Sequence, residues 1–331
     1  MNLLLKSKQV PNWRKIQRNN FTQVNLLADF LQLSKENRDQ LLSRPRFPLN
    51  LPLRLASKIE KNNLNDPILR QFVPLVDELK ITPDFVSDPV QDQTFQKTNK
   101  ILHKYNKRAL IVTTSACAMN CRFCFRQNFP YETEEKKFDL DLEYIKENPT
   151  ISEIILSGGD PLSLSNESLA ELFSSLRDID HIKRIRFHSR FPIGIPERID
   201  PPFLDLLKNC SKQIFFIIHC NHPREIDADI ASTLKKIQCL GIPVLNQSVL
   251  LKGVNDDEET LLELSVALVD IGVIPYYLHC LDPVQGAGHF ALTEERAREL
   301  IRYLQQNQSG YSVPRLVREV PGKPSKTFIN H

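Results

Sequence analysis

Three cysteines lie close together in one short stretch of this sequence, CAMNCRFCFRQNFP, at residues 117–130. Cys117, Cys121 and Cys124 have the spacing C-x3-C-x2-C and directly follow a run of β-branched residues that is typical of a strand. Three thiolates on one loop can bind three irons of a cubane cluster and leave the fourth iron open to a small molecule. The spacing therefore predicts an iron–sulfur site with one exchangeable position.

Two other kinds of site are compatible with these cysteines. A redox dithiol would pair Cys121 with Cys124 and would need a lowered thiol pKa, to which the neighbouring Arg122 and Arg126 are able to contribute. A structural zinc site would need a fourth protein ligand. Three histidines are candidates for that ligand: His103, His188 and His219.

Short β-branched runs recur along the chain from residue 108, separated by segments with helical periodicity. The runs are ALIVTT (109–114), EIILS (153–157), RIRFH (184–188), IFFIIH (214–219), VLNQSVLL (244–251) and PYYLH (275–279). The clearest helical sets are Leu169, Leu172, Phe173 and Leu176, then Ala297, Leu300, Ile301 and Leu304. A further helix is expected over NDDEETLLELSVALVDIG (255–272), because it has an acidic start and ends on glycine.

Repeated strand–helix units predict an α/β fold with a parallel sheet that is covered on both faces. Six such units form either an open, partial barrel or a doubly wound sheet. In both folds the carboxyl ends of the strands meet at one edge, where the loops form the site. Polar sequences stand at these positions: CAMNC, GGD, HSR, HCNH and HCLD. Four histidines near strand ends either line the pocket or serve the framework: His188, His219, His222 and His279.

The first hundred residues differ in pattern from the rest of the chain. Residues 81–100 lose all periodicity, and we expect a long ordered loop or linker there. Apolar residues recur at helical spacing before it: Phe21, Val24, Leu27, Phe30 and Leu31. The expected parts are an N-terminal helical region and linker (1–100), a barrel core (101–290) and a C-terminal helix with a short extension (291–331).

Composition places the chain among ordinary globular proteins. Hydrophobic residues make up 41% and charged residues 25% of the 331 residues, and the net charge of +3 predicts neither nucleic-acid nor membrane binding. The apolar run 3–5 is too short for a signal peptide, and no window approaches the ~20 apolar residues of a membrane span. Seven cysteines, an odd number with three clustered, predict a reduced, cytoplasmic protein without a disulfide framework.

The cysteine loop and a second motif together resemble the radical S-adenosylmethionine enzymes. CAMNCRFCF has an aromatic residue before its last cysteine, and SGGDPL (157–162) follows one strand–helix unit later. Longer stretches resemble the lysine 2,3-aminomutase family, and within it the branch that makes β-lysine for translation elongation factor P. These stretches, spread over residues 50–331, are ILHKYNKRAL, LNQSVLLKGVND, PYYLHCLDPVQGAGHF, SGYSVPRLV and PGKPSKT.

The resemblance implies a partial (β/α)6 TIM-like barrel that holds a [4Fe–4S] cluster on the three cysteines. S-adenosylmethionine would chelate the open iron through its amino and carboxylate groups. Gly158 and Gly159 would then let the backbone approach this ligand closely. Asp160 would either accept a hydrogen bond from the amino group or shape the turn.

The same resemblance implies a second cofactor, pyridoxal 5′-phosphate. Lys326 in PSKT matches the family lysine that forms the Schiff base, and Lys323 is a rival because the segment PGKPS departs from the family's glycine run. A neutral amine is needed there, so the site should desolvate the lysine or place it near another cation. Gln247 would lie beside the bound cofactors. Three residues would lie near the cofactor phosphate: Lys104, Tyr105 and Arg108.

Three charged residues match positions that select the substrate in this family. Arg126 corresponds to the arginine that holds the carboxylate of lysine, and Asp282 to the aspartate that meets its side-chain ammonium. Glu319 stands where the family carries a second aspartate, a change of one methylene that keeps the charge. The implied activity is that of an isomerase, an intramolecular aminotransferase that converts (S)-α-lysine into (R)-β-lysine by a radical mechanism.

The implied partners are a reductant such as flavodoxin or ferredoxin, and, through the product, elongation factor P and its lysyl ligase. One alternative is an aminomutase that makes β-lysine for general metabolism; another is a zinc-stabilised interaction protein without catalysis. No cysteine follows Cys280, so the C-terminal zinc and the zinc-linked assembly of the free-lysine enzymes are not expected. The cysteines outside the loop are expected to be small buried hydrophobic residues: Cys210, Cys220, Cys239 and Cys280.

Overall fold

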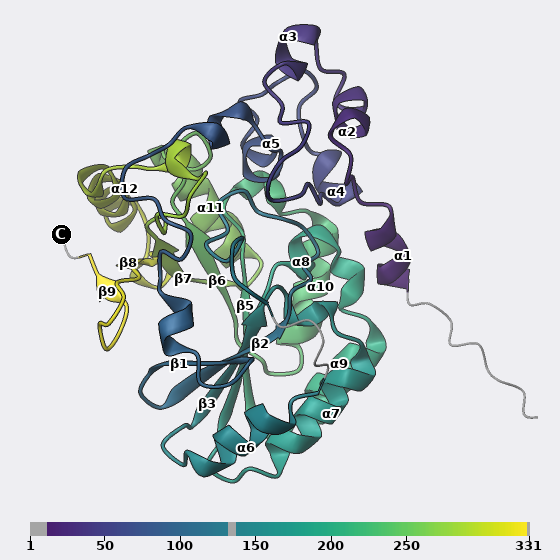
Figure 1. Ribbon diagram of the computed structural model, residues 1–331, viewed down its shortest axis with the longest axis vertical. Helices are drawn as coiled ribbons and strands as arrows, with labels where there is room; N and C mark the ends of the chain where they lie inside the picture. The colour runs from purple at the N-terminus through teal and green to yellow at the C-terminus, as the bar shows by residue number, and fades with distance from the viewer. Residues whose placement is uncertain (1–11, 132–136, 330–331) are drawn as a thin grey trace, which may run out of the picture.

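One sheet organises the protein, and the computed structural model describes it within residues 12–131 and 137–329. Nine strands in these ranges lie side by side in the order of the chain, β1 to β9 (Figure 1). The apolar run at 3–5 lies outside the described residues. The strands are β1 Ile101–Tyr105, β2 Arg108–Thr114, β3 Glu153–Gly158, β4 Arg184–Ser189, β5 Gln213–Ile218, β6 Val244–Val249, β7 Ile274–His279, β8 Arg315–Arg318 and β9 Thr327–Phe328.

Strands β2 to β8 pair in parallel, each with the next along the chain. A doubly wound sheet would reverse its strand order at a switch point, whereas a barrel keeps it. Antiparallel strands β1 and β9 stand at the two ends of the order, so the sheet does not close. The fold is therefore a partial, TIM-like barrel, and the doubly wound alternative is wrong.

Helices between the strands cover the outer face of the sheet (Figure 1). They are α6 Asp139–Glu147, α7 Asn166–Arg177, α9 Pro201–Lys208, α10 Ala228–Gln238, α11 Glu258–Asp270 and α12 Glu294–Asn307. The two helical sets found in the sequence are the buried faces of α7 and α12. Helix α11 begins after Asp257, whose side chain accepts a hydrogen bond from Thr260 N, and it is followed by Gly272 at φ +73°.

Shorter helical segments complete the connections. They are α8 Phe191–Gly194, η3 Pro161–Ser163, η4 Pro196–Arg198, η5 Pro223–Glu225, η6 Gly288–Phe290 and η7 Gly310–Ser312. The main core lies between the sheet and its helices. Phe187 of β4 stacks on Phe216 of β5 at 5.7 Å between ring centroids and meets Phe173 and Phe203 edge-on or tilted. This aromatic packing orients the outer faces of β4 and β5, so alternate residues face the barrel interior.

The N-terminal region packs against the same core. Its helices are α1 Asn12–Arg18, α2 Val24–Phe30, α3 Lys35–Arg38, α4 Leu53–Ala56 and α5 Pro67–Phe72. Trp13 of α1 lies edge-on to Phe191 at 5.6 Å, and one continuous cluster of buried apolar side chains joins this region to the barrel. The segment 81–100 is an ordered loop, as expected; it contains η2 Asp92–Phe95, follows η1 Val76–Leu79, and forms a bridge from Val86 to Val284.

Three strands were not expected from the sequence. Strand β1 reads ILHKY, in which polar residues interrupt the apolar run, and a tight turn with Lys107 at φ +64° joins it to β2. Strands β8 and β9 have four and two residues, too few for a periodic signal. They matter because Glu319 directly follows β8 and Lys326 directly precedes β9. Among the described residues, no helix is long and apolar enough to cross a membrane.

Candidate active site

The cysteine loop leaves the carboxyl end of β2 and is held in place by the N-terminal region. The carbonyl oxygen of Cys117 accepts hydrogen bonds from Gln17 Nε2 at 3.1 Å and from Asn50 Nδ2 at 3.2 Å. Asn20 Nδ2 donates to the carbonyl oxygen of Ala118 at 2.8 Å. The first hundred residues therefore fix the backbone of the loop that carries the thiols.

Arg122, between the second and third cysteines, is an anchor of this loop. Its guanidinium is buried and donates to both carboxylate oxygens of Glu78 at 2.7 and 2.5 Å, and to the carbonyl oxygen of Phe47 at 2.8 Å. Arg122 is thus committed to Glu78 rather than to a neighbouring thiol. The predicted contribution of Arg122 to a reactive dithiol is wrong.

Removing the carboxylate that pairs with Arg122 should destabilise the fold. We expect Glu78→Gln to lower the free energy of unfolding by about 3–5 kcal/mol, because a buried guanidinium is left without its counter-charge. Chemical denaturation of the protein would measure this, with the exposed Glu171→Gln as the matched control. An unfolding free energy within about 1 kcal/mol of wild type for Glu78→Gln would contradict the anchoring role.

The three thiols are held in a setting that disfavours their ionisation. Burial raises the pKa of all three, to about 11 for Cys124, and repulsion between neighbouring thiolates adds to the effect for Cys117 and Cys124. A redox dithiol needs the opposite shift, so the redox interpretation is not supported. A bound cation of high charge would compensate the buried thiolates, and three thiolates on one loop are the donor set that a cubane cluster uses.

A zinc site finds no support among the candidates. Within residues 12–131 and 137–329 no group of three or more His, Cys, Asp or Glu side chains is arranged around a single ion. His103 Nδ1 is hydrogen-bonded to the hydroxyl of Tyr144 at 2.8 Å. The rings of His188 and His219 are tilted against each other, with their centroids 5.5 Å apart. The donor set therefore fits a cluster, which spreads its thiolates over several irons, better than one tetrahedral ion.

The Gly-Gly-Asp turn at the end of β3 is packed directly against the cysteine loop. Gly158 has φ +113°, and a Cβ on Gly159 would lie 2.4 Å from the carbonyl oxygen of Ala116. Gly159 N donates to Thr114 O at 2.7 Å, and Asp160 N donates to Ala116 O at 2.8 Å. The glycines are thus required by the close approach of two protein loops, a reason that the sequence did not reveal.

Asp160 shapes this turn, one of the two roles considered for it. Its Oδ1 accepts from Leu162 N at 3.0 Å, and its Oδ2 accepts from Arg190 N at 2.7 Å and from Ser189 Oγ at 3.1 Å. Burial raises its pKa to about 6, while these hydrogen bonds oppose the shift. Asp160 therefore ties the end of β3 to the end of β4 beside the cysteine loop.

A second group of charges, which we term the charged cluster, gathers residues from four distant parts of the chain: Asp92, Lys104, Arg126, Glu319 and Lys326. Arg126 Nε donates to Asp92 Oδ2 at 2.7 Å, and Lys104 Nζ lies 3.6 Å from Asp92 Oδ1 and 3.3 Å from Glu319 Oε1. Lys326 Nζ donates to Glu319 Oε2 at 2.9 Å. The cluster is therefore a continuous chain of alternating charges.

Tyr105 belongs to the same assembly, because its hydroxyl donates to Glu319 Oε1. Burial alone would raise the pKa of Glu319, but Lys326, Tyr105 and Lys104 together hold it below its ordinary value. Arg108 lies over the ring of Tyr105, with its guanidinium carbon 4.4 Å from the centroid. Of the three residues expected near a cofactor phosphate, Lys104 and Tyr105 thus contact one carboxylate, and Arg108 packs on Tyr105.

The two candidate lysines of the C-terminal hairpin have different surroundings. The side chain of Lys326 is 23% exposed and points to Glu319, and its charge helps to lower the pKa values of the buried His188 and His279. Lys323 lies in the exposed turn between β8 and β9. Of the two, Lys326 faces the barrel interior.

Asp282, just after β7, is the carboxylate in this region that lacks a partner. Among the described residues its side chain makes no hydrogen bond and no ion pair at contact distance, although Lys326 and Lys104 act on it from further away. Burial raises its pKa to about 7, and Glu319 and Asp92 add to that shift. The charges of Arg126 and Asp282 both act on the Cys124 thiol, so both residues lie near the cysteine loop.

Polar side chains also face the barrel interior. Asn246 Nδ2 and Ser248 Oγ of β6 both donate a hydrogen bond to the carbonyl oxygen of Cys220. Because side chains alternate along a strand, Gln247 between them points to the opposite, inner face. The buried Nε2 atoms of His188 and His279 have no hydrogen-bond partner within the described ranges. These donors are available to a molecule bound in the barrel. His222 differs, because it caps η5 by accepting from Arg224 N.

Several residues at the site were missed by the sequence analysis. Asp92 lies in the loop 81–100, and Gln71 and Glu78 lie in the N-terminal region, where no motif marks them. Among the cysteines outside the loop, Cys220 is buried and Cys210 and Cys280 are partly buried. Cys239 is exposed at the end of α10, so the expectation of burial is wrong for it.

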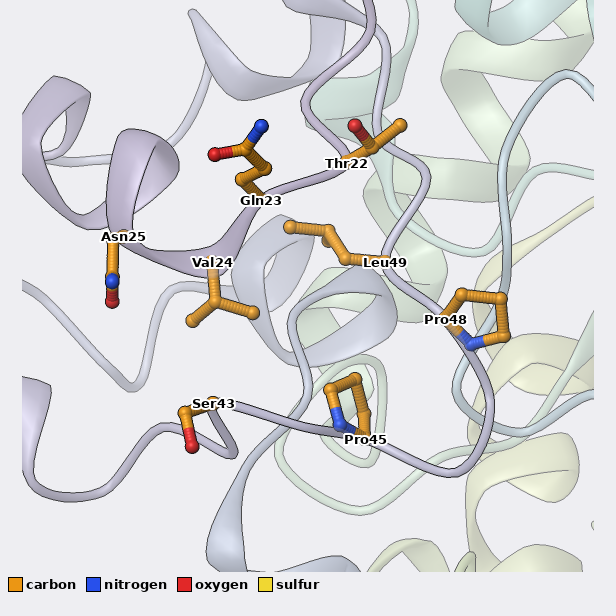
Figure 2. A pocket seen from close by; sticks show the side chains of 8 residues that line it. All are labelled: Thr22, Gln23, Val24, Asn25, Ser43, Pro45, Pro48 and Leu49. Carbon is orange, nitrogen blue, oxygen red and sulfur yellow. The ribbon is translucent and has the colours of Figure 1, made fainter.

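A surface cavity lies elsewhere in the described part of the chain. It measures about 320 Å³ and opens between the start of α2 and the loop 43–49 of the N-terminal region (Figure 2). Its lining is Thr22, Gln23, Val24, Asn25, Ser43, Pro45, Pro48 and Leu49. None of the residues singled out for chemistry belongs to it, so the cavity is separate from the candidate site.

Comparison with known proteins gives an independent result. Residues 111–265 match the model of the radical SAM superfamily. The chain is 40% identical to an L-lysine 2,3-aminomutase of Haemophilus influenzae, covering 97% of this chain and 96% of that protein. It is 44% identical to one of Escherichia coli, covering 86% and 84%, and 34% identical to one of Clostridium subterminale, covering 96% and 77%.

Proposed function

We propose, from the premise that this chain belongs to the L-lysine 2,3-aminomutase family of radical S-adenosylmethionine enzymes, that it moves the α-amino group of L-lysine to the β-carbon. Enzymes of this family are isomerases that use a [4Fe–4S] cluster, S-adenosylmethionine and pyridoxal phosphate. When bound, the first two supply an organic radical that removes hydrogen, and the third supplies a π-system across which nitrogen moves. The protein has to hold these groups and the substrate at fixed positions relative to one another.

In this proposal Cys117, Cys121 and Cys124 would ligate three irons of the cluster and would leave the fourth to S-adenosylmethionine. Two features support the assignment: the N-terminal region holds the backbone of the cysteine loop, and the turn at Gly159 packs directly against that loop. This packing would hold the three thiolates in one fixed geometry for the cluster.

Lys326 is the proposed point of attachment for pyridoxal phosphate. Its place at the barrel interior supports this choice over Lys323, although its neighbour is the carboxylate of Glu319 and not the second cation expected from the sequence. The free ammonium of Lys326 is chemically the same group as the side-chain ammonium of lysine. If pyridoxal phosphate were held on Lys326, Glu319 would lose its present partner and would be free to meet the side-chain ammonium of the substrate.

Substrate recognition is proposed to use Arg126 for the carboxylate and Asp282, with Glu319, for the ammonium. The observation that carries the function is the unpaired Asp282. Asp282 is half-buried, a carboxylate partly shielded from water is unfavourable without a cation, and the ammonium of lysine would supply the missing charge. Asp92 holds Arg126 through Nε, and Nη1 makes only a long hydrogen bond of 3.4 Å to Ser157 Oγ, so the terminal nitrogens of the guanidinium can still donate to a carboxylate.

The raised pKa of Asp282 predicts how binding depends on pH. Below about pH 7 the carboxyl is protonated and loses its attraction for an ammonium, so kcat/KM for lysine should fall as pH drops through that value. Asp282→Asn should weaken lysine binding by about 2–5 kcal/mol and remove this pH step.

The measurement is a pH profile of turnover with lysine, and cluster content and S-adenosylmethionine binding serve as controls that should stay unchanged. If Asp282→Asn and Glu319→Gln each turned lysine over at wild-type efficiency, the ammonium would be held elsewhere and the substrate assignment would fail.

We further propose that the product is (R)-β-lysine for the modification of elongation factor P in the cytoplasm. Resemblance to the branch that serves this factor supports the proposal, and all seven cysteines are free, as in a reducing compartment. Mass spectrometry of the factor, purified from cells with and without this gene, is the test. A modification that persists without the gene would favour a role for β-lysine in general metabolism.

A further inference from the structure

Arg190 reaches the cysteine loop from the next part of the barrel. It directly follows β4, and its backbone N–H is fixed by Asp160 Oδ2 at 2.7 Å. Its side chain is 8% exposed, and Nη1 donates to the sulfur of Cys121 at 2.9 Å. A cationic donor is thus aimed at one of the three candidate iron ligands.

The guanidinium is held in this position on several sides. Nη2 donates to Gln71 Oε1 at 2.6 Å and to Glu225 Oε2 at 2.8 Å. The rings of Phe72 and Phe123 lie 4.6 and 5.6 Å from its central carbon. A charged side chain clamped in this way does not adjust when the charge of its neighbour changes.

Glu225 is itself fully buried and held in place. Its Oε1 accepts from Asn221 N at 2.9 Å, from His222 N at 3.0 Å and from Gln71 Nε2 at 3.1 Å. It is the carboxylate that pairs with the guanidinium of Arg190, through Nη2, whereas Nη1 donates to the thiol. The site therefore presents a fixed dipole to Cys121, with its positive end at the sulfur.

Hydrogen bonds to ligand sulfurs and nearby fixed charge are known to set the potential of iron–sulfur clusters. Reduction adds one electron to the cluster, and the added negative charge is stabilised by a cation that donates to a ligand sulfur. A carboxylate behind that cation opposes the effect. The two residues should therefore act on the potential in opposite directions.

We propose that Arg190 and Glu225 are positioning residues that set the reduction potential of the cluster, the arginine raising it and the glutamate limiting the rise. This inference rests on the proposed ligation of the cluster by Cys121. It assigns a redox role to a buried ion pair that contacts one of the proposed cluster ligands.

The test is a potentiometric titration of the full, anaerobically reconstituted protein, followed by electron paramagnetic resonance without S-adenosylmethionine. Arg190→Gln should shift the midpoint potential to a more negative value, and Glu225→Gln should shift it to a less negative one. Arg190→Lys keeps the positive charge, so its midpoint potential should lie between those of Arg190→Gln and wild type. Arg184→Gln, at the opposite end of the same strand, is the matched control and should leave the potential unchanged.

Arg190→Gln leaves Glu225 as a buried, unpaired charge and on that account alone could prevent folding. The double variant Arg190→Gln with Glu225→Gln keeps the site neutral, and Glu225→Gln alone keeps the donor to sulfur. The midpoint potential of the double variant should be more negative than that of wild type, because the cationic hydrogen bond to the sulfur of Cys121 is gone.

Potentials that equal wild type in the variants, or shifts of the same sign for Arg190→Gln and Glu225→Gln, would overturn the inference. So would weaker S-adenosylmethionine binding by Arg190→Gln at an unchanged potential, which would make the arginine a ligand contact. A wild-type protein that takes up no iron would overturn the proposed function together with this inference, whereas a loaded cluster with unmoved potentials would overturn the inference alone.

Discussion

Replacing Cys117, Cys121 or Cys124 with alanine is expected to remove the bound iron and abolish β-lysine formation. A cubane holds about four irons per chain, and loss of one of three ligands leaves two irons without protein support. The pKa values of these partly buried thiols are raised, so the two thiols left in each variant would ionise less readily without the positive charge of the irons. Iron and acid-labile sulfide analysis after anaerobic purification measures the effect.

Cys210→Ala is the matched control, because Cys210 is partly buried and packs against the main core away from the loop. It should keep full iron content. Stoichiometric zinc in reconstituted wild-type protein, without uptake of iron, would reject the cluster and favour the interaction-protein alternative.

Lys326→Ala is expected to abolish turnover while the cluster remains. Wild-type protein loaded with pyridoxal phosphate should show an absorbance band that borohydride converts into a covalent adduct, and mass spectrometry should locate the adduct at residue 326. The alanine variant should lose both signals. Glu319 keeps its contacts with Tyr105 and Lys104 in that variant, so the fold should survive.

Lys323→Ala serves as the comparison for this experiment, because the side chain of Lys323 lies in the exposed turn of the same hairpin. It should retain the band, the adduct and the activity. An adduct on Lys323 in the wild-type protein would show that the wrong lysine was assigned.

The parts of the site that the sequence predicted are those marked by strong local patterns. Three cysteines at fixed spacing after a strand, and a Gly-Gly-Asp turn after the next strand, stand out because each motif depends on residues that are adjacent in the chain. Burial on both faces made the central strands almost continuously apolar, which identified the parallel sheet.

The parts that the sequence did not predict depend on contacts between distant segments. Asp92 meets Arg126 across 34 residues, and Arg190 meets Gln71 across 119 residues. No periodicity records such pairs, because each partner is one polar residue in an irregular segment. Likewise, the need for glycine at Gly159 comes from the carbonyl oxygen of Ala116 on another loop, which becomes visible only when the loops are packed.

The charged cluster shows a further limit of prediction from the sequence. Glu319 and Lys326 were singled out separately, but their direct contact follows from the two short strands β8 and β9, which lack a sequence signal. The hairpin turns residues seven positions apart toward each other. The pairing of β8 with β9 brings Glu319 and Lys326 together, and neither strand is long enough to be recognised from the sequence alone.

The most direct test of this account is one anaerobic incubation. Reconstituted protein is mixed with L-lysine, S-adenosylmethionine, pyridoxal phosphate and a strong reductant, and the amino acids are separated on a chiral phase. The account predicts (R)-β-lysine that depends on all four additions and is absent with the Lys326→Ala protein. If protein with a full cluster and bound pyridoxal phosphate left lysine unchanged, or isomerised another amino acid instead, the proposed function would be wrong.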